Sequence, residues 1–292
     1  MIHGSASLRA ELSFRGQQRA AAIAWPHELT LGTVPSVIFG RGERGGHGNF
    51  HPTSYRNLCA NEQWARRLAK VHTGYRRALP RADWRWRELD SANSSDALLM
   101  NIFCYTRRLR NRALCSLLGI DCGLAPEFGY RPRIPLRNGK TDRTEIDMRL
   151  GELLVEAKLT ESGFQSAPPR LVERYRDFEQ TFDRAELPKA CAISEGEIEE
   201  NGNDAQRSGQ EAVQNYQLIR GILAAHASGG SFCLMCDARR PDLIEHWYAT
   251  VRAVRDCSLR CRLQLITWQE LTFALPNALQ TFLQKKYGIE AA

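Results

Sequence analysis

Polar and apolar positions alternate most clearly between Thr144 and Thr160, on both sides of Gly151. Before the glycine, Glu145, Asp147 and Arg149 alternate with Ile146, Met148 and Leu150. After it, Glu152, Leu154, Glu156, Lys158 and Thr160 alternate with Leu153, Val155, Ala157 and Leu159. Because side chains of a strand point to opposite faces in turn, the pattern predicts two strands joined at Gly151. If the strands pair, Asp147, Glu156 and Lys158 converge on one side of the sheet.

Helical and strand patterns elsewhere predict an α/β protein. Apolar residues at helical spacing predict helices over residues 61–78, 94–119, 170–185, 206–226, 241–254 and 276–287. Extended segments are expected over residues 126–135, 231–237 and 262–267, with a turn at 137–140. Residues 1–45 show no sustained period and are expected to be a poorly ordered extension to a domain of residues 46–292. Residues 50–87 of that domain form an accessory region rich in arginine and aromatic residues.

The predicted helix 206–226 carries a stripe of glutamines. Gln206, Gln210, Gln214 and Gln217 stand at positions i, i+4, i+8 and i+11. Amide side chains on such a stripe can donate hydrogen bonds to phosphate oxygens or to a metal-bound water. The alternative is that these residues are exposed helix formers with no ligand.

Composition and charge narrow the class of protein. The 292 residues are 43% hydrophobic and 25% charged, as in ordinary soluble globular proteins. The sequence has no apolar run long enough to span a membrane and opens without an export signal, so we expect a cytoplasmic protein. Residues 1–113 hold 18 basic and 8 acidic residues, a net +10, and the remainder is −3, which together give +7. A basic amino-terminal part suits a polyanion such as DNA or RNA, although a solvated arginine-rich surface explains it equally well.

Nine cysteines in a chain without an export signal are expected to be reduced thiols. Cys233 and Cys236, with Cys257 and Cys261, have a spacing that admits a zinc site. However, Cys233 and Cys236 lie in an apolar segment that is typical of a buried strand, on which residues three apart face opposite sides. Small buried thiols are therefore the favoured interpretation.

The converging side chains of the central hairpin predict metal chemistry. Two carboxylates supply the hard oxygen ligands that Mg²⁺ prefers, and a lysine two residues beyond can orient water or stabilise charge on a phosphate. A cation would lower the lysine pKa and carboxylates would raise it, so the sequence leaves its protonation state open. A cross-strand ion pair without catalysis is the alternative interpretation.

Asp147, eight intervening residues and Glu156-Ala157-Lys158 resemble the D-xn-(D/E)-x-K signature of the PD-(D/E)xK nuclease superfamily. Ile146 stands where that family often has a proline before the aspartate. The segments 94–103 and 156–164 are also similar to bacterial proteins predicted to be restriction endonucleases. The resemblance covers about residues 88–270.

The resemblance implies a restriction-endonuclease-like αβββαβ core, a mixed central sheet flanked by helices, with helical amino-terminal additions. It implies hydrolysis of phosphodiester bonds in DNA, with Asp147, Glu156 and the Ala157 carbonyl holding Mg²⁺, for which Mn²⁺ can substitute. Lys158 would orient the attacking water. Gln210 or Gln214 would face the site, because the helix after the E-x-K strand often presents a glutamine or a basic residue to it. A first-helix carboxylate can join the metal site, and Glu88, Asp90 and Asp96 all remain candidates. A homodimer is compatible with the resemblance, and a non-catalytic nucleic-acid-binding protein of the same fold is the alternative.

Overall fold

A five-stranded mixed sheet forms the centre of the protein in a computed structural model, which describes residues 3–23, 27–30, 36–42, 45–70, 87–192 and 210–291. The strand order is β12-β11-β7-β6-β3. These strands are β3 (Glu127–Tyr130), β6 (Ile146–Leu150), β7 (Leu153–Ala157), β11 (Ser231–Cys236) and β12 (Leu263–Thr267). The order of elements along the chain gives the predicted αβββαβ core.

The register of the sheet follows from the pairing of β6 with β7. These two strands are antiparallel and joined by a turn at Gly151, whose φ of +58° suits a residue without a side chain. Strand β3 is antiparallel to β6, whereas β11 is parallel to both β7 and β12. The predicted hairpin and the predicted strands 231–237 and 262–267 are therefore confirmed.

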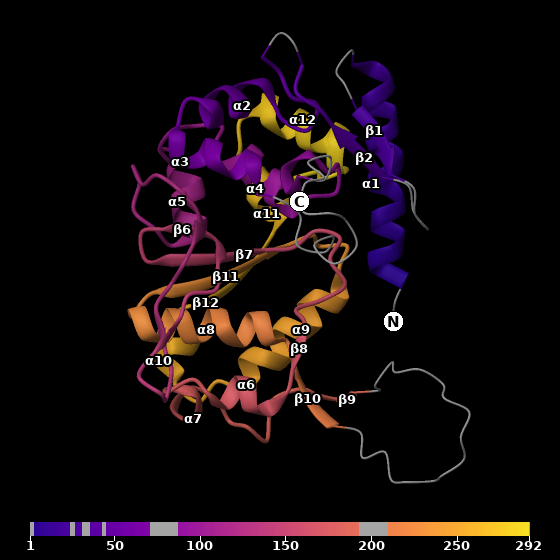
Figure 1. The fold of residues 1–292 in the computed structure, drawn as a ribbon. Helices are drawn as coiled ribbons and strands as arrows, with labels where there is room; N and C mark the ends of the chain where they lie inside the picture. The colour runs from indigo at the N-terminus through magenta and orange to yellow at the C-terminus, as the bar shows by residue number, and fades with distance from the viewer. Residues whose placement is uncertain are drawn as a thin grey trace, which may run out of the picture.

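Helices cover both faces of this sheet, as Figure 1 shows. One face packs on α4 (Ser95–Phe103), α5 (Arg112–Leu118), α11 (Trp268–Phe273) and α12 (Asn277–Tyr287). The other packs on α8 (Tyr216–Ser228) and α9 (Pro241–Arg252). Leu153 and Val155 belong to the first hydrophobic core and Leu154 to the second, as the alternation along β7 requires.

Shorter elements surround this three-layer core. The remaining helices are α1 (His3–Ala22), α2 (Pro52–Cys59), α3 (Glu62–Ala65), α6 (Pro169–Glu173), α7 (Phe178–Thr181) and α10 (Cys257–Arg260), with 3₁₀ turns η1 (Arg66–Ala69) and η3 (Glu88–Asp90). The remaining strands are β1 (His27–Thr30), β2 (Ser36–Phe39), β4 (Ile134–Pro135), β5 (Thr141–Asp142), β8 (Ser166–Ala167), β9 (Lys189–Ala192) and β10 (Gln210–Gln214). Strands β8, β10 and β9 form a separate small sheet.

The single long helix predicted over residues 94–119 is wrong, because the chain forms α4 and α5 with a loop between them. The Asn57 amide donates hydrogen bonds to the carbonyls of Cys104 and Tyr105, which satisfies the end of α4. Asn111 then caps α5 by accepting a bond from Leu114 N–H. Arg107, Arg108 and Arg110 lie in the loop between the two helices.

Three other predicted helices are also shorter than expected. Residues 170–185 form α6 and α7 instead of one helix, and the part of residues 61–78 that the structure describes forms α3 followed by η1. The predicted helix 206–226 begins only at Tyr216, and Gln210–Gln214 form strand β10. Asn215 separates strand from helix with a φ of +60°, and its amide donates to the His246 carbonyl and the Thr250 hydroxyl.

The expected poorly ordered extension is wrong for its described part. Helix α1 packs on α12, and its Leu8 and Leu12 are buried in the same core as β6 and β7. Strand β2 adds Val37 and Phe39 to a smaller cluster. Cys233 and Cys236 are buried in β11 as predicted. None of the described helices combines the length and apolar character needed to span a bilayer.

Candidate active site

The sheet register brings Asp147 and Glu156 together. The antiparallel pairing of β6 with β7 ends at Met148 and Val155, one residue before Asp147 and Glu156, and the charge of Glu156 acts on Asp147. Asp147 Oδ2 accepts a hydrogen bond of 2.7 Å from the Ala157 N–H, which ties the start of β6 to the end of β7. The two predicted carboxylates therefore lie next to each other at one end of the sheet.

Lys158 joins them by an ion pair. Its Nζ donates to Glu156 Oε1 at 2.9 Å, and both side chains are buried. The backbone of Lys158 is held from two sides, because its N–H donates to the Met235 carbonyl and its carbonyl accepts from Trp268 Nε1. The structure thus brings together Asp147, Glu156 and Lys158, the three residues of the predicted motif.

The ion pair decides the protonation state of Lys158. Burial alone would lower its pKa, but the carboxylates of Glu156, Glu161 and Asp147 outweigh burial and raise the pKa above its ordinary value. Lys158 is therefore a charged ammonium in this arrangement. It can donate hydrogen bonds and stabilise negative charge, whereas it cannot take up a further proton.

Asp147 lies close to a second carboxylate, that of Glu156. Burial, together with the charges of Glu156 and Asp96, raises the pKa of Asp147 well above its usual range, against the opposing effects of Lys158 and the Ala157 N–H. Without a further positive charge this carboxyl group tends to keep a proton. A divalent cation bound by the two carboxylates would offset the repulsion between their negative charges.

The donor set fits Mg²⁺ rather than an ion that needs a complete protein cage. Among the described residues no group of three or more His, Cys, Asp and Glu side chains is spaced to hold a metal ion. Mg²⁺ usually takes only one or two carboxylates from the protein and completes its shell with water and substrate phosphate. Asp147 and Glu156 meet that requirement, because each uses one carboxylate oxygen for the protein donors described above.

The three carboxylates left open near the first helix differ in their surroundings. Asp96, in the first turn of α4, is buried and close enough to Asp147 for its charge to raise the pKa of Asp147. Asp90 instead pairs with His47 at 3.1 Å, and Glu88 pairs with Lys70 at 2.8 Å. Asp96 is therefore the first-helix acid that stands beside the motif.

An ionic cluster that sequence reasoning missed surrounds Asp96. Arg67 donates to Asp96 Oδ2 at 2.5 Å and to Glu145 Oε1 at 2.6 Å, and Lys70 donates to the same Glu145 oxygen at 2.8 Å. These two cations lower the pKa of Glu145 to about 2, although burial alone would raise it. The sequence showed Glu145 on the polar face of the strand, but its partners are 75 or more residues away.

Glu161 is a second residue that the sequence motif does not identify. Its carboxylate accepts from Ser95 Oγ at 2.5 Å and from Leu159 N–H at 2.6 Å. It therefore links the end of the E-x-K segment to the start of α4. Glu161 also adds to the negative charge around Lys158.

The structure does not place Gln210 and Gln214 on a helix beside the motif. Both lie in β10 of the small sheet, where Gln214 pairs with Ser166 and the Gln214 N–H donates to the Pro188 carbonyl. The predicted helical stripe is wrong, because Asn215 starts the helix after these residues. A role for Gln210 or Gln214 in the site remains an untested prediction.

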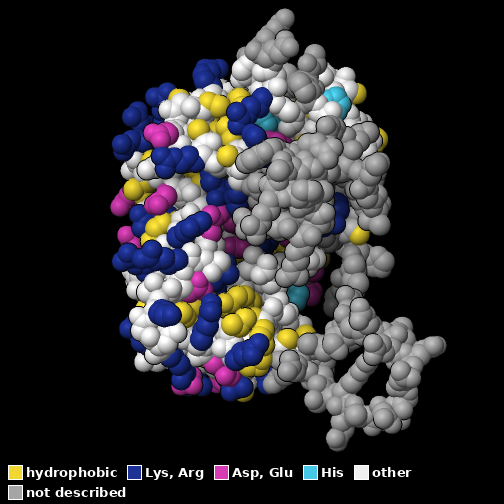
Figure 2. Space-filling model, in the orientation of Figure 1, with side chains coloured by type: hydrophobic (Ala, Val, Ile, Leu, Met, Phe, Trp, Pro, Cys, Tyr) yellow, Lys and Arg dark blue, Asp and Glu magenta, His cyan; other side chains and the backbone are white. Residues whose placement is uncertain are grey.

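An open groove of about 460 Å³ lies against the ionic cluster. Its lining includes Arg67, Lys70 and Glu145 together with Trp64, Arg66, Phe128 and Arg131. Figure 2 shows Lys and Arg side chains gathered along the left side of the molecule, where Figure 1 places α3 and α5. Exposed arginines there include Arg66, Arg107, Arg108, Arg110 and Arg112. Of these five arginines, Arg66 lines the groove beside Glu145, together with Arg67, Lys70 and Arg131.

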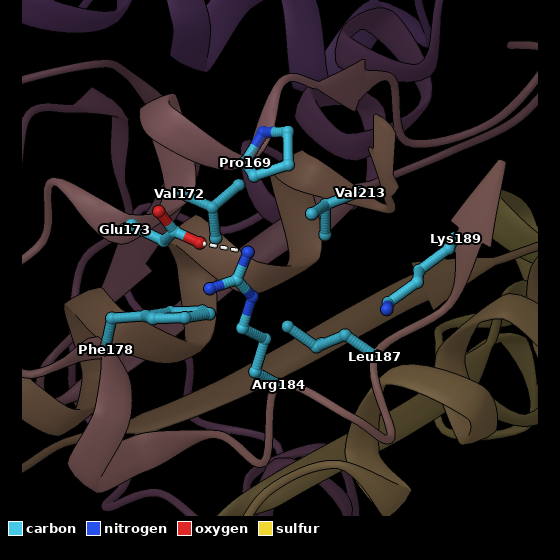
Figure 3. A pocket seen from close by; sticks show the side chains of 8 residues that line it. All are labelled: Pro169, Val172, Glu173, Phe178, Arg184, Leu187, Lys189 and Val213. Carbon is cyan, nitrogen blue, oxygen red and sulfur yellow. Dashed lines mark ion pairs between the residues drawn. The ribbon is translucent and has the colours of Figure 1, made fainter. Parts of the chain in front are cut away.

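A second hollow, shown in Figure 3, lies away from the motif under α6 and α7. Its volume of about 10 Å³ admits no more than about one water molecule. Arg184 and Glu173 pair across it at 2.8 Å, and Val172, Leu187 and Val213 provide apolar walls. The hollow is too small for a substrate.

A family model described as REase-ARP, Restriction Endonuclease associating with ARP, matches residues 21–288 of the chain. The chain belongs to this family. No curated protein and no solved structure gives a match. The REase-ARP match spans the hairpin with Asp147 and Glu156, the preceding helix α4 and every strand of the central sheet. The sheet and its flanking helices are consistent with the restriction-endonuclease-like fold that the sequence motif implies.

Proposed function

We propose that the protein is a Mg²⁺-dependent nuclease that hydrolyses phosphodiester bonds of DNA. The observation that carries the proposal is the meeting of Asp147, Glu156 and Lys158 at one end of the sheet in a member of a restriction endonuclease family. The cations that line the groove beside Glu145 support a polyanionic substrate, since Lys and Arg contacts position a nucleic acid backbone.

Each side chain has a distinct role in the proposed reaction. Asp147 and Glu156, with the Ala157 carbonyl, would hold the metal ion, which when bound supplies Lewis-acid stabilisation and an activated water. Lys158 is charged and donates hydrogen bonds, so it orients the attacking water and stabilises the negative charge that grows on the phosphate. Asp96 adds negative charge beside the carboxylate pair, and Glu161 holds the end of β7 against α4.

Replacement of Lys158 by alanine tests this assignment. We expect Lys158→Ala to lower the rate of DNA cleavage by at least about 10²-fold, the usual effect of removing one preorganised donor from a transition state. Supercoiled plasmid and end-labelled linear DNA, each with Mg²⁺ and with EDTA, report cleavage and show whether ends or internal bonds are cut. Affinity for DNA in Ca²⁺, measured in parallel, should change little.

The matched control is Arg149→Ala. Arg149 is a cation of the same hairpin, but it is half-exposed, pairs with Glu127 and lies at the other end of β6. Its replacement should leave cleavage unchanged. Thermal melting of both variants separates lost chemistry from lost folding, because removing Lys158 leaves Glu156 buried without its cation. Wild-type protein that binds DNA in Ca²⁺ but never cuts it in Mg²⁺ would instead favour a non-catalytic binding protein.

A further inference from the structure

Arg220, in the second turn of α8, is a buried guanidinium without an acidic partner. The residue is 7% exposed, and no carboxylate of the described residues forms an ion pair with it. Its Nε is buried with no hydrogen-bond partner, and its Nη2 reaches only the Glu145 carbonyl, at 3.4 Å. Arginine presents five N–H donors in a fixed fork, so most of this donor capacity is unused.

The position of Arg220 puts these donors at the motif end of the sheet. Helix α8 covers the face to which Leu154 of β7 points, and Glu156 points the same way because it is two residues further along the strand. The Glu145 carbonyl that Arg220 contacts is two residues before Asp147. Figure 1 shows α8 running along the sheet on this side. The Tyr216 ring, one helical turn earlier, lies 5.7 Å from the guanidinium carbon and supports it.

The end of the sheet that carries the motif is rich in acidic side chains, so a cation without an acidic partner stands out there. Asp96, Glu145, Asp147, Glu156 and Glu161 would together repel a phosphate. The nearby cations Arg67, Lys70 and Lys158 are each held in ion pairs with these acids. Arg220 is a cation whose charge is not already matched by a carboxylate among the described residues, and its planar fork suits two phosphoryl oxygens.

We propose that Arg220 binds a phosphate of the nucleic acid strand that enters the site, through its unused N–H donors. The inference rests on the proposed nuclease function and extends it by assigning a phosphate contact to α8. The positive charge of Arg220 thereby reduces the repulsion between the substrate phosphates and the carboxylates at this end of the sheet.

The salt dependence of DNA binding tests this contact without any cleavage. Affinity for a short duplex is measured in EDTA and in Ca²⁺ over a range of salt concentrations, for wild type, Arg220→Gln and Arg252→Gln. Each lost phosphate contact lowers the slope of log affinity against log salt by about 0.9 for duplex DNA. We expect that loss for Arg220→Gln only. Arg252→Gln removes the same charge from an exposed position on α9 that pairs with Glu186, so its slope should match wild type.

The variant Arg220→Lys keeps the positive charge and serves as the control for a folding defect. We expect this variant to regain most of the slope while binding more weakly than wild type, because an ammonium cannot reproduce the two-pronged contact. A wild-type slope for a folded Arg220→Gln protein, as judged by its thermal melt, would overturn the inference. If wild type fails to cut DNA in Mg²⁺ but the slope still falls for Arg220→Gln, the phosphate contact stands and the nuclease proposal falls.

Discussion

Three buried cations of this protein have different electrostatic surroundings. Lys158 is paired with carboxylates, and Arg220 has no carboxylate partner among the described residues. Lys286 of α12 is buried against the Ala92 carbonyl and the Tyr287 ring. The sequence could place Lys158 beside Glu156 through strand alternation. It could not give the protonation state, which depends on burial and on Glu161 and Asp147. Nor could it reveal Arg220, since the pattern marks that position only as part of a helix.

Lys286 is expected to destabilise the folded protein at neutral pH. Burial, and then the charge of Arg19, lowers the pKa of Lys286 well below its usual value. The unfolded chain therefore binds more protons than the folded one, and this contribution to the free energy of unfolding increases as pH rises toward the ordinary lysine pKa of about 10.4. We expect Lys286→Met to raise the free energy of unfolding at neutral pH by about 1 to 3 kcal/mol. Urea unfolding between neutral and alkaline pH measures this difference.

The neighbouring residue provides the control for that measurement. Lys285 is exposed on the same helix turn, so Lys285→Met should leave stability and its pH dependence almost unchanged. The gain from Lys286→Met should shrink as pH rises, because the wild-type lysine then loses its proton in both states. A gain that stays constant over the pH range would show that packing, not the buried charge, causes the effect.

At the scale of elements, the β6–β7 hairpin and strands β11 and β12 were predicted correctly, because their patterns are visible over a few adjacent residues. Gly151 and the alternation around it predicted the β6–β7 hairpin, and this hairpin brings Asp147 near Glu156. The helix predicted over residues 94–119 was split by contacts from Asn57, which lies far away in sequence. The glutamine stripe fitted a helical period, but Gln210–Gln214 pair with β9 and β8 instead. Tertiary hydrogen bonds decided each of these cases.

Close approach of α8 to the sheet gives a prediction at this scale. A Cβ on Gly221 would lie 2.3 Å from ring atoms of Phe232, a fully buried residue of β11. We expect Gly221→Ala to destabilise the protein by about 1 to 3 kcal/mol through overpacking, although alanine is the better helix former. Urea unfolding measures the cost. Phe232→Leu in the same chain should recover part of it, and strictly additive effects of the two substitutions would contradict the contact.

At the scale of the whole molecule, the amino-terminal helix α1 packs on the domain from which the sequence suggested it was separate. Residues 1–45 show no sustained apolar period, yet α1 is held by polar contacts as well as by the buried Leu8 and Leu12. Arg9 donates to the Thr160 carbonyl, and Glu11 pairs with Arg239 at 2.9 Å. The amino-terminal helix thus reaches the segment that follows Lys158. The charge asymmetry along the sequence was a sound guide to a basic surface, but it could not show the ionic cluster of Arg67, Lys70, Asp96 and Glu145.

Helix α1 should therefore stabilise the whole domain. Leu12 is 1% exposed in the main core, whereas Phe14, two residues later, is 59% exposed. We expect Leu12→Ala to lower the free energy of unfolding by about 2 to 5 kcal/mol, the usual cost of such a cavity, in a single transition for the whole chain. Phe14→Ala, which removes more apolar surface but no buried contact, should cost less than about 0.5 kcal/mol. Urea unfolding followed by tryptophan fluorescence makes the comparison, because Trp64, Trp247 and Trp268 lie outside α1. Equal, small effects of the two substitutions would mean that α1 contributes nothing to the core, and the Arg9–Thr160 contact would then lose its support as a link to the candidate active site.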